Sequence, residues 1–102
     1  MATSTIKRPS CYQTIWFSSV TTESFTVSAN GNKEITATGA FAGWYPVGVI
    51  GNAPGSNTQI FPYGIEVTAS SGSVTVTAWV KNTSSSAVTD TRTFYVMWIK
   101  EV

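Results

Sequence analysis

The acidic residues and the absence of histidine decide which chemistry this sequence could support. With no histidine, the chain lacks the most common general base and a common zinc ligand. Its acids are Glu23, Glu34, Glu66, Asp90 and Glu101. A glycosidase needs two carboxylates about 5 to 10 Å apart across a groove, and Glu34 and Glu66 are the pair that could converge. Both fall on the outward side of their predicted strands, so we expect solvated carboxylates and no enzymatic activity.

Other motifs of catalysis and metal binding are also missing. Cys11 is the single cysteine, so one chain offers neither a disulfide nor a thiolate metal cluster. We expect it to be half-buried near the first strand; the alternative is a reactive or intermolecularly paired thiol. Gly48 and Gly51 lie in a β context with no helix after them, which does not fit a phosphate-binding loop. Asn82-Thr83-Ser84 matches the glycosylation acceptor pattern, and we interpret it as a turn. We therefore expect no cofactor and no metal.

Aromatic side chains favour a binding function instead. The chain has four tryptophans and four tyrosines, more than one small core requires. An exposed ring beside Asn, Thr or Gln can take the apolar face of a sugar while the polar groups take its hydroxyls. The candidates for ligand contact are Trp44, Tyr45, Tyr63 and Trp79. The alternative is that these rings pack at a rim or at a subunit contact.

Short β-strands must position these side chains. The predicted strands cover residues 14–20, 24–29, 33–38, 44–51, 59–68, 73–81 and 92–100, with a short extra strand at 87–89. Residues 73–81 alternate apolar and polar side chains, which is the pattern of a half-buried strand. No window has the apolar spacing and the cap of a helix. Seven or eight strands joined by short turns predict an all-β fold, an antiparallel β-sandwich of jelly-roll-like type.

Three local signals refine this prediction. Asn30-Gly31 predicts a hairpin turn between its two flanking strands, because both residues tolerate a positive φ. Pro46 cannot donate to a β-ladder, so it predicts an edge strand or a bulge. In residues 59–68, the spacing places Tyr63, Ile65 and Val67 on one face.

Length and composition bound the remaining function classes. The 102 residues fit a single domain, with residues 1–10 as an N-terminal arm or an extra strand. The net charge of +1 gives no field for nucleic acid or an acidic membrane. The longest apolar run, residues 95–99, is far shorter than the ~18 residues of a membrane-spanning helix. The first residues do not resemble a secretory signal, so we expect any route out of the cell to be another one, such as release on a virus particle.

The strand predicted at residues 92–100 is apolar on both faces. Phe94, Val96 and Trp98 lie on one side, and Tyr95, Met97 and Ile99 lie on the other. A strand of this kind requires cover on both sides, and in so small a chain one cover can be a second copy. We therefore expect a homo-oligomer with Tyr95, Met97 and Trp98 at or near the subunit contact.

Three segments also carry a family resemblance. Gly43-Trp-Tyr-Pro-Val-Gly48, Val80-Lys-Asn-Thr-Ser-Ser-Ser-Ala-Val-Thr89 and Tyr95-Val-Met-Trp-Ile-Lys100 resemble small β modules at the ends of tail-fibre or baseplate proteins of phages that infect Gram-positive, often gut-dwelling, bacteria. The resemblance implies a virion or prophage origin, with synthesis in the bacterial cytoplasm, and frequent trimerisation. It also implies attachment to a cell-surface glycan or to another virion protein.

Two functions follow as expectations. The first is a non-enzymatic phage structural or receptor-binding module that assembles as a homo-oligomer, with a trimer favoured. The alternative is a monomeric carbohydrate-binding module that uses its exposed aromatic residues.

Overall fold

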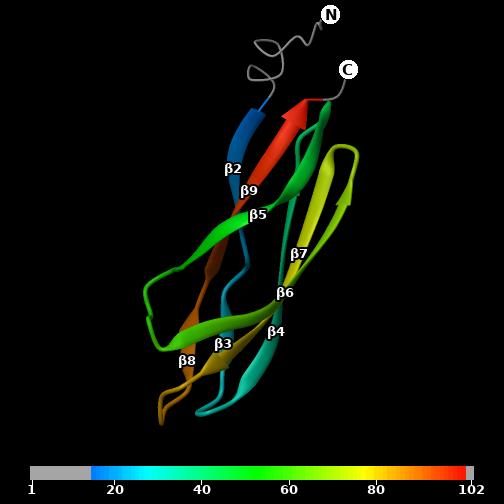
Figure 1. Ribbon diagram of the computed structural model, residues 1–102. Coiled ribbons are helices and arrows are strands. Elements are labelled where there is room, and N and C mark those ends of the chain that lie inside the picture. The colour runs from blue at the N-terminus through cyan, green and yellow to red at the C-terminus, as the bar shows by residue number, and fades with distance from the viewer. Residues whose placement is uncertain (1–14, 101–102) are drawn as a thin grey trace, which may run out of the picture.

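Antiparallel β-strands, joined by turns and short connections, form the chain. The computed structural model describes residues 15–100 (Figure 1). The strands are β2 (Ile15–Thr21), β3 (Phe25–Val27), β4 (Asn32–Ala40), β5 (Trp44–Pro54), β6 (Ile60–Ser70), β7 (Ser73–Asn82), β8 (Val88–Asp90) and β9 (Arg92–Lys100). This confirms the predicted all-β, sandwich-like fold. The predicted N-terminal arm and Cys11 lie outside the described residues. Within residues 15–100, no helix is long and apolar enough to cross a membrane.

Two three-stranded sheets form the layers of the sandwich. Their strand orders are β2-β9-β5 and β4-β7-β6, and a short ribbon of β3 and β8 extends the β2–β9 pairing. The pairings are nested, since β2 pairs with β9, β3 with β8 and β4 with β7. This nesting draws the two halves of the chain into one long molecule of 62 × 22 × 19 Å (Figure 1).

The core lies between the inner faces of the two sheets. Its centre is formed by β7 and β9, the middle strands of their sheets, because a middle strand has neighbours on both edges. The inward residues of these strands are Val74, Val76, Ala78, Val80, Phe94, Val96 and Trp98, all at most 1% exposed. The alternation predicted for residues 73–81 is therefore confirmed.

The turn at Asn30 and Gly31 forms, but it does not make the predicted hairpin. Asn30 has a φ of 56°, and the amide of Gly31 donates to the carbonyl of Ser28 at 2.9 Å. The flanking strands then enter different sheets, because β3 pairs with β8 and β4 pairs with β7. Turn residues set where a chain reverses, and long-range pairing selects the partner strand.

Bulges mark β5 and β6, one edge strand of each sheet. The register of β5 against β9 shifts after Pro46, which confirms the bulge or edge predicted there. In β6, Gly64 adopts a φ of 65° and adds one residue to the strand. Tyr63 therefore pairs with Trp79 on the outer face, whereas Ile65 pairs with Ala78 on the inner side. The prediction that Tyr63, Ile65 and Val67 share one face is therefore wrong, because the extra residue turns Tyr63 to the opposite side from the other two.

Asn82, the asparagine of the segment that matches a glycosylation acceptor, has a structural role. Its side chain is fully buried, and its Nδ2 donates to the carbonyls of Val27, Ser28 and Ser86 at 2.8–3.2 Å. Its Oδ1 accepts from the amide of Ser84 at 2.9 Å. The amide group thus joins the end of β7 to the turn after β3 and to the 84–86 bend. In the folded chain this nitrogen is a structural donor.

Candidate functional site

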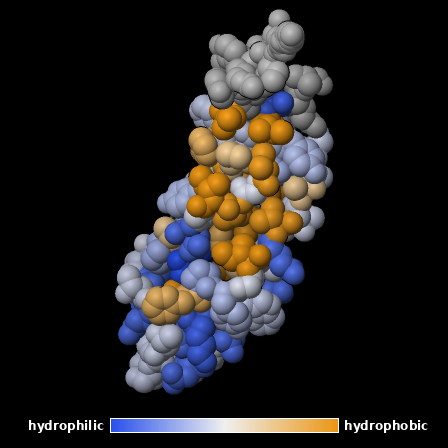
Figure 2. Space-filling model, viewed as in Figure 1, coloured by the Kyte–Doolittle hydropathy of each residue, from blue (hydrophilic) through white to orange (hydrophobic). Residues whose placement is uncertain are grey.

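The outer face of sheet β2-β9-β5 is apolar over most of its length. The name apolar face is used below for eight outward-facing residues of this sheet: Ile15, Phe17, Tyr45, Val47, Ile50, Tyr95, Met97 and Ile99. Met97 is half-buried, and the others expose 38–61% of their surface. The strand register places Ile15 and Tyr45 on either side of Ile99, and Phe17 beside Met97. Figure 2 shows apolar side chains gathered over the end of the molecule that holds these strands, whereas the other end is mostly polar. The set contains no charged side chain.

Strand β9 divides the predicted contact residues between this face and the core. Tyr95 and Met97 point outward onto the apolar face. Trp98 points inward, where its ring makes an edge contact with Phe41 and its Nε1 donates to Ser18 Oγ at 2.8 Å. Because this chain already buries Trp98, that residue has no surface left for a subunit contact and is removed from the expected set.

The outer face of sheet β4-β7-β6 has a different chemistry. Threonines pair across its strands, with Thr36 opposite Thr77 and Thr38 opposite Thr75. One row departs from this pattern. In it, Trp79 lies between Glu34 on β4 and Tyr63 on β6. We call these three residues the aromatic row. Both rings are exposed, Trp79 by 43% and Tyr63 by 48%.

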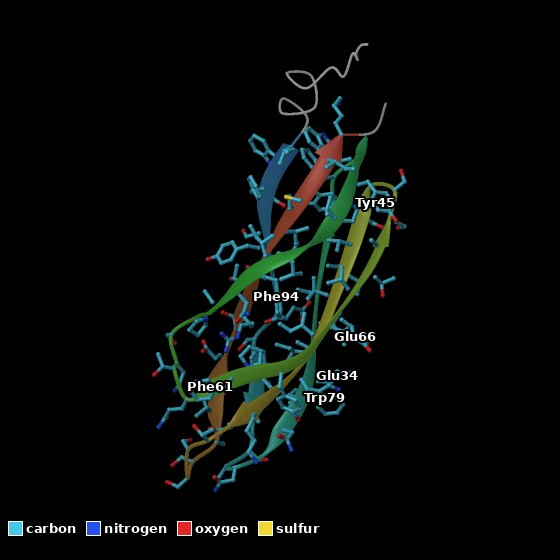
Figure 3. The ribbon with its side chains drawn as sticks, in the orientation of Figure 1. Glu34, Tyr45, Phe61, Glu66, Trp79 and Phe94 are labelled. Carbon is cyan, nitrogen blue, oxygen red and sulfur yellow. The ribbon has the colours of Figure 1, made fainter. Side chains whose placement is uncertain are left out.

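The structure separates the four residues predicted to contact a ligand. Tyr63 and Trp79 are brought together in the aromatic row, and Tyr45 belongs to the apolar face at the other end of the view in Figure 3. Trp44 stacks on Phe41 with centroids 5.0 Å apart and planes at 5°, and the ammonium of Lys100 lies 5.3 Å from its ring. Trp44 is therefore part of the packed end of the sandwich, and its ring faces are occupied.

The acids Glu34 and Glu66 do not flank a groove. They sit on β4 and β6, which lie on opposite sides of β7, and both are exposed on the flat outer face. Two strand spacings separate such positions by about 10 Å before the offset along the strands is added. Figure 3 shows Glu34 beside Trp79 and Glu66 farther along the sheet. Within residues 15–100, no three His, Cys, Asp or Glu side chains gather as a metal site requires.

Asp90 is the buried acid, and its contacts are structural. It accepts from the amides of Ser56 and Asn57, both at 2.9 Å. Burial acts to raise the pKa of Asp90, but the amides of Asn57, Thr91 and Ser56 and the charge of Arg92 outweigh burial and hold that pKa below its ordinary value. The carboxylate therefore anchors the loop after β5 onto β8.

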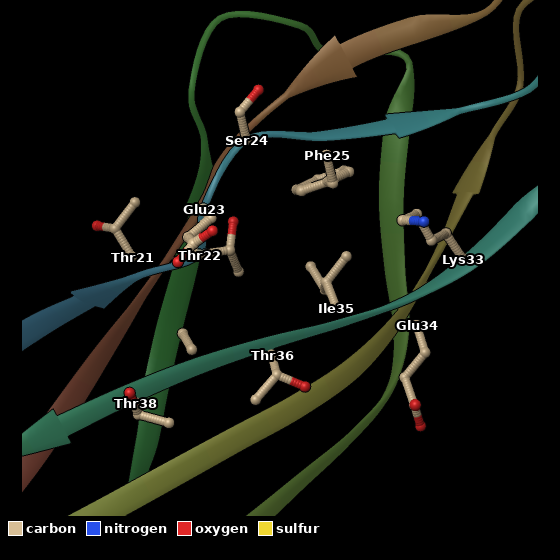
Figure 4. Close-up of a pocket in the computed structure, with 11 residues that line it drawn as sticks. Thr21, Thr22, Glu23, Ser24, Phe25, Lys33, Glu34, Ile35, Thr36 and Thr38 are labelled. Carbon is tan, nitrogen blue, oxygen red and sulfur yellow. The ribbon is translucent and has the colours of Figure 1, made fainter.

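Two hollows open along the side of the sandwich between β2 and β4. The larger, about 400 Å³, lies between residues 21–25 and 33–38, with Phe25 and Ile35 at its base (Figure 4). Glu34 points away from it, on the other side of β4. The smaller, about 230 Å³, lies beside Trp16 and Phe41. The ring centroids of Trp16 and Phe41 lie 6.5 Å apart, a contact that nothing in the sequence indicated.

Comparison with family models, with curated proteins and with solved structures finds no match for this chain. Function is therefore inferred from the two outer faces and from their residues.

Proposed function

We propose that this chain is a non-enzymatic module that assembles with copies of itself through the apolar face, as a structural or receptor-binding part of a phage or prophage particle. The observation that carries the proposal is the uncharged, exposed apolar face itself. Soluble monomers rarely expose apolar patches of more than a few hundred Å², and larger patches mark interaction sites.

The size and composition of the apolar face favour a second copy as its occupant. Seven side chains that each expose roughly half of a ~200 Å² surface present about 700 Å², close to the ~800 Å² per partner of a standard interface. The face has aromatic residues and methionine and lacks charge, which is the composition of an interface core. A surface without charges also has none that repel when two copies meet.

The absence of catalysis and the virion setting are parts of the same proposal. Glu34 and Glu66 lie apart on a flat face, and Asp90 is occupied by backbone donors. The phage assignment draws on the resemblance of residues 43–48, 80–89 and 95–100 to tail-fibre and baseplate modules. That resemblance also implies three copies.

Light scattering after size exclusion tests the assembly. At tens of micromolar we expect a mass of about three times 10.9 kDa. The variant Phe17→Glu places a charge in the apolar face and should give a monomer, because burying an unpaired charge is costly. A wild-type chain that runs as a clean monomer contradicts the proposal.

Phe61→Glu is the matched control. Phe61 and Phe17 are exposed to nearly the same extent, 53% and 56%, but Phe61 lies on the outer face of the other sheet. The control should keep the wild-type mass. Loss of assembly in both variants would place the contact elsewhere.

A second candidate function, carbohydrate binding, is favoured by the adjacent rings of Tyr63 and Trp79. A glycan array read with wild-type protein and with Trp79→Ala tests it. We expect hits that disappear in the variant, and an array without hits removes this candidate while leaving the assembly proposal in place.

A further inference from the structure

The aromatic row forms a continuous strip across three strands. Trp79 is directly opposite Glu34 on one side and Tyr63 on the other. Side chains directly opposite each other have Cβ atoms about 5 Å apart, so the carboxylate and both rings lie within reach of one small ligand. Figure 3 shows Glu34 and Trp79 projecting together from the same part of the sheet.

Among the described residues, neither Trp79 nor Tyr63 stacks on another aromatic ring. The aromatic contacts in the described chain join Trp16, Phe41, Trp44 and Trp98 at the other end of the sandwich. Trp79 occupies a position that Thr75 and Thr77 fill elsewhere on the same face of β7. The strand pattern could be met by threonine here too, so pairing within the sheet does not itself require an indole at this position.

The groups around the rings are hydroxyls and carboxylates. Thr77 precedes Trp79 on the outer face of β7, and Glu66 is directly opposite Thr77. The nearest ammonium on this face, that of Lys81, donates to the carbonyl of Asn30 at 2.8 Å and is directed away from the row. The charged groups beside the rings are therefore carboxylates, and the neighbouring hydroxyls can donate or accept.

We infer that the aromatic row, with Thr77 and Glu66 beside it, binds the face of a neutral or amino-substituted sugar and discriminates against anionic sugars. The indole and phenol rings take the apolar face of the sugar ring, and the carboxylates accept from its hydroxyls. An ammonium on the sugar adds an exposed ion pair, a gain of about two- to fivefold in affinity, and a sugar carboxylate loses a similar factor. This inference deepens the carbohydrate-binding candidate and rests on it.

Binding of defined tetrasaccharides followed by NMR tests the inference. The probes are N-acetylglucosamine tetramer as the neutral sugar, glucosamine tetramer as the cationic one and a hyaluronan tetrasaccharide as the anionic one. The indole N–H signal of Trp79 is identified by its loss in Trp79→Phe. We expect all three probes to shift this signal, with the hyaluronan probe binding about two- to fivefold more weakly than the neutral probe.

Variants then separate the rings from the charges. Trp79→Ala should abolish binding, whereas Trp16→Ala, a change at another exposed tryptophan, should keep it. The double change Glu34→Gln and Glu66→Gln should weaken the cationic probe more than the neutral one, so that the two- to fivefold preference for the cationic probe is lost.

Each failure has a distinct meaning. If hyaluronan binds as tightly as the neutral probe, the charge discrimination is wrong while carbohydrate binding stands. If no probe moves that signal, the site itself is overturned. The mass from light scattering, measured on the same samples, reports separately on assembly.

Discussion

At the scale of single residues, two buried polar side chains fix parts of the chain that have no regular pairing. Asn82 satisfies three carbonyls and one amide from the turn after β3 and from the 84–86 bend. Asp90 satisfies two amides of the loop after β5. Both sit where a strand ends, so each replaces the ladder bonds that the backbone loses there.

Exchange of Asn82 for aspartate tests the first of these anchors. The shape is unchanged, but Asn82→Asp puts a carboxylate oxygen against the carbonyls of Val27, Ser28 and Ser86 in a fully buried site. We expect a loss of about 3 kcal/mol or more in the free energy of unfolding, because the new carboxylate oxygen faces three carbonyls and the buried charge keeps only the amide of Ser84 as a donor. Urea denaturation measures it, and Asn32→Asp on the exposed start of β4 is the control. An equal, small effect of both changes would contradict the assigned role.

Asp90 gives the chain a sensitivity to acid with a defined sign. Its folded-state pKa is lowered, so its carboxylate stabilises the fold above the pKa of the unfolded chain, about 3.9. That contribution disappears as the pH falls through the lower, folded-state pKa. We expect Asp90→Asn to lose about 1–3 kcal/mol at pH 7, since the amide group opposes the amides of Ser56 and Asn57.

Denaturation curves between pH 7 and pH 2 measure this effect. The wild-type chain should lose more stability than Asp90→Asn over the acid part of that range, whereas the exposed-site change Glu23→Gln should follow the wild type. Parallel curves for wild type and Asp90→Asn would show that Asp90 does not account for the acid sensitivity.

At the scale of elements, the two sheets approach closely where β2 meets β4. A Cβ built on Gly39 would lie 2.5 Å from Cγ1 of the buried Val20, whereas one built on Gly48 meets nothing within 4 Å. Gly39→Ala should therefore push β2 away from β4 and cost about 1–3 kcal/mol. Gly48→Ala should change the free energy of unfolding by no more than about 0.5 kcal/mol. Urea denaturation of both variants measures this. Similar losses in the free energy of unfolding would mean that the Val20 side chain moves aside without destabilising the fold.

Local patterns were sufficient to predict most strands and insufficient to predict their partners. The alternation at 73–81 and the strand at 92–100 correspond to β7 and β9 because side-chain period is a local property. The hairpin predicted at Asn30 and Gly31 was wrong because sheet membership is decided by contacts with β7 and β8, far along the chain.

The same limit applies to the candidate sites. The outward position of Trp79 follows from alternation, but its meeting with Tyr63 depends on the extra residue at Gly64. Trp44 was a candidate for ligand contact with rim packing as the alternative, and the stacking of Phe41 on it at the tight turn between β4 and β5 favours the alternative. Which rings are free is a tertiary property that a single strand's pattern does not contain.

At the scale of the whole molecule, the sandwich is narrow and its two outer faces differ. Each layer has three strands, so only the middle strand of each is enclosed by neighbours, and a large share of the apolar residues remains at the surface. The apolar face can be covered by another copy while the threonine-lined face with its aromatic row stays open. Assembly and ligand contact thus use opposite sides of one protomer.

This arrangement predicts that thermal stability depends on protein concentration. In a trimer that dissociates as it unfolds, each protomer gains about two-thirds of the ~1.4 kcal/mol that a tenfold rise in a free partner gives, or about 0.9 kcal/mol. For a domain of this size, that amounts to a rise in Tm of about 4 to 7 °C per tenfold. Circular dichroism melts over a hundredfold range of concentration measure it. Phe17→Glu should melt at one temperature throughout, because its folded chain gains no partner, while Phe61→Glu should retain the wild-type dependence. A wild-type Tm that does not change with concentration would mean that the apolar face stays exposed in the folded protein.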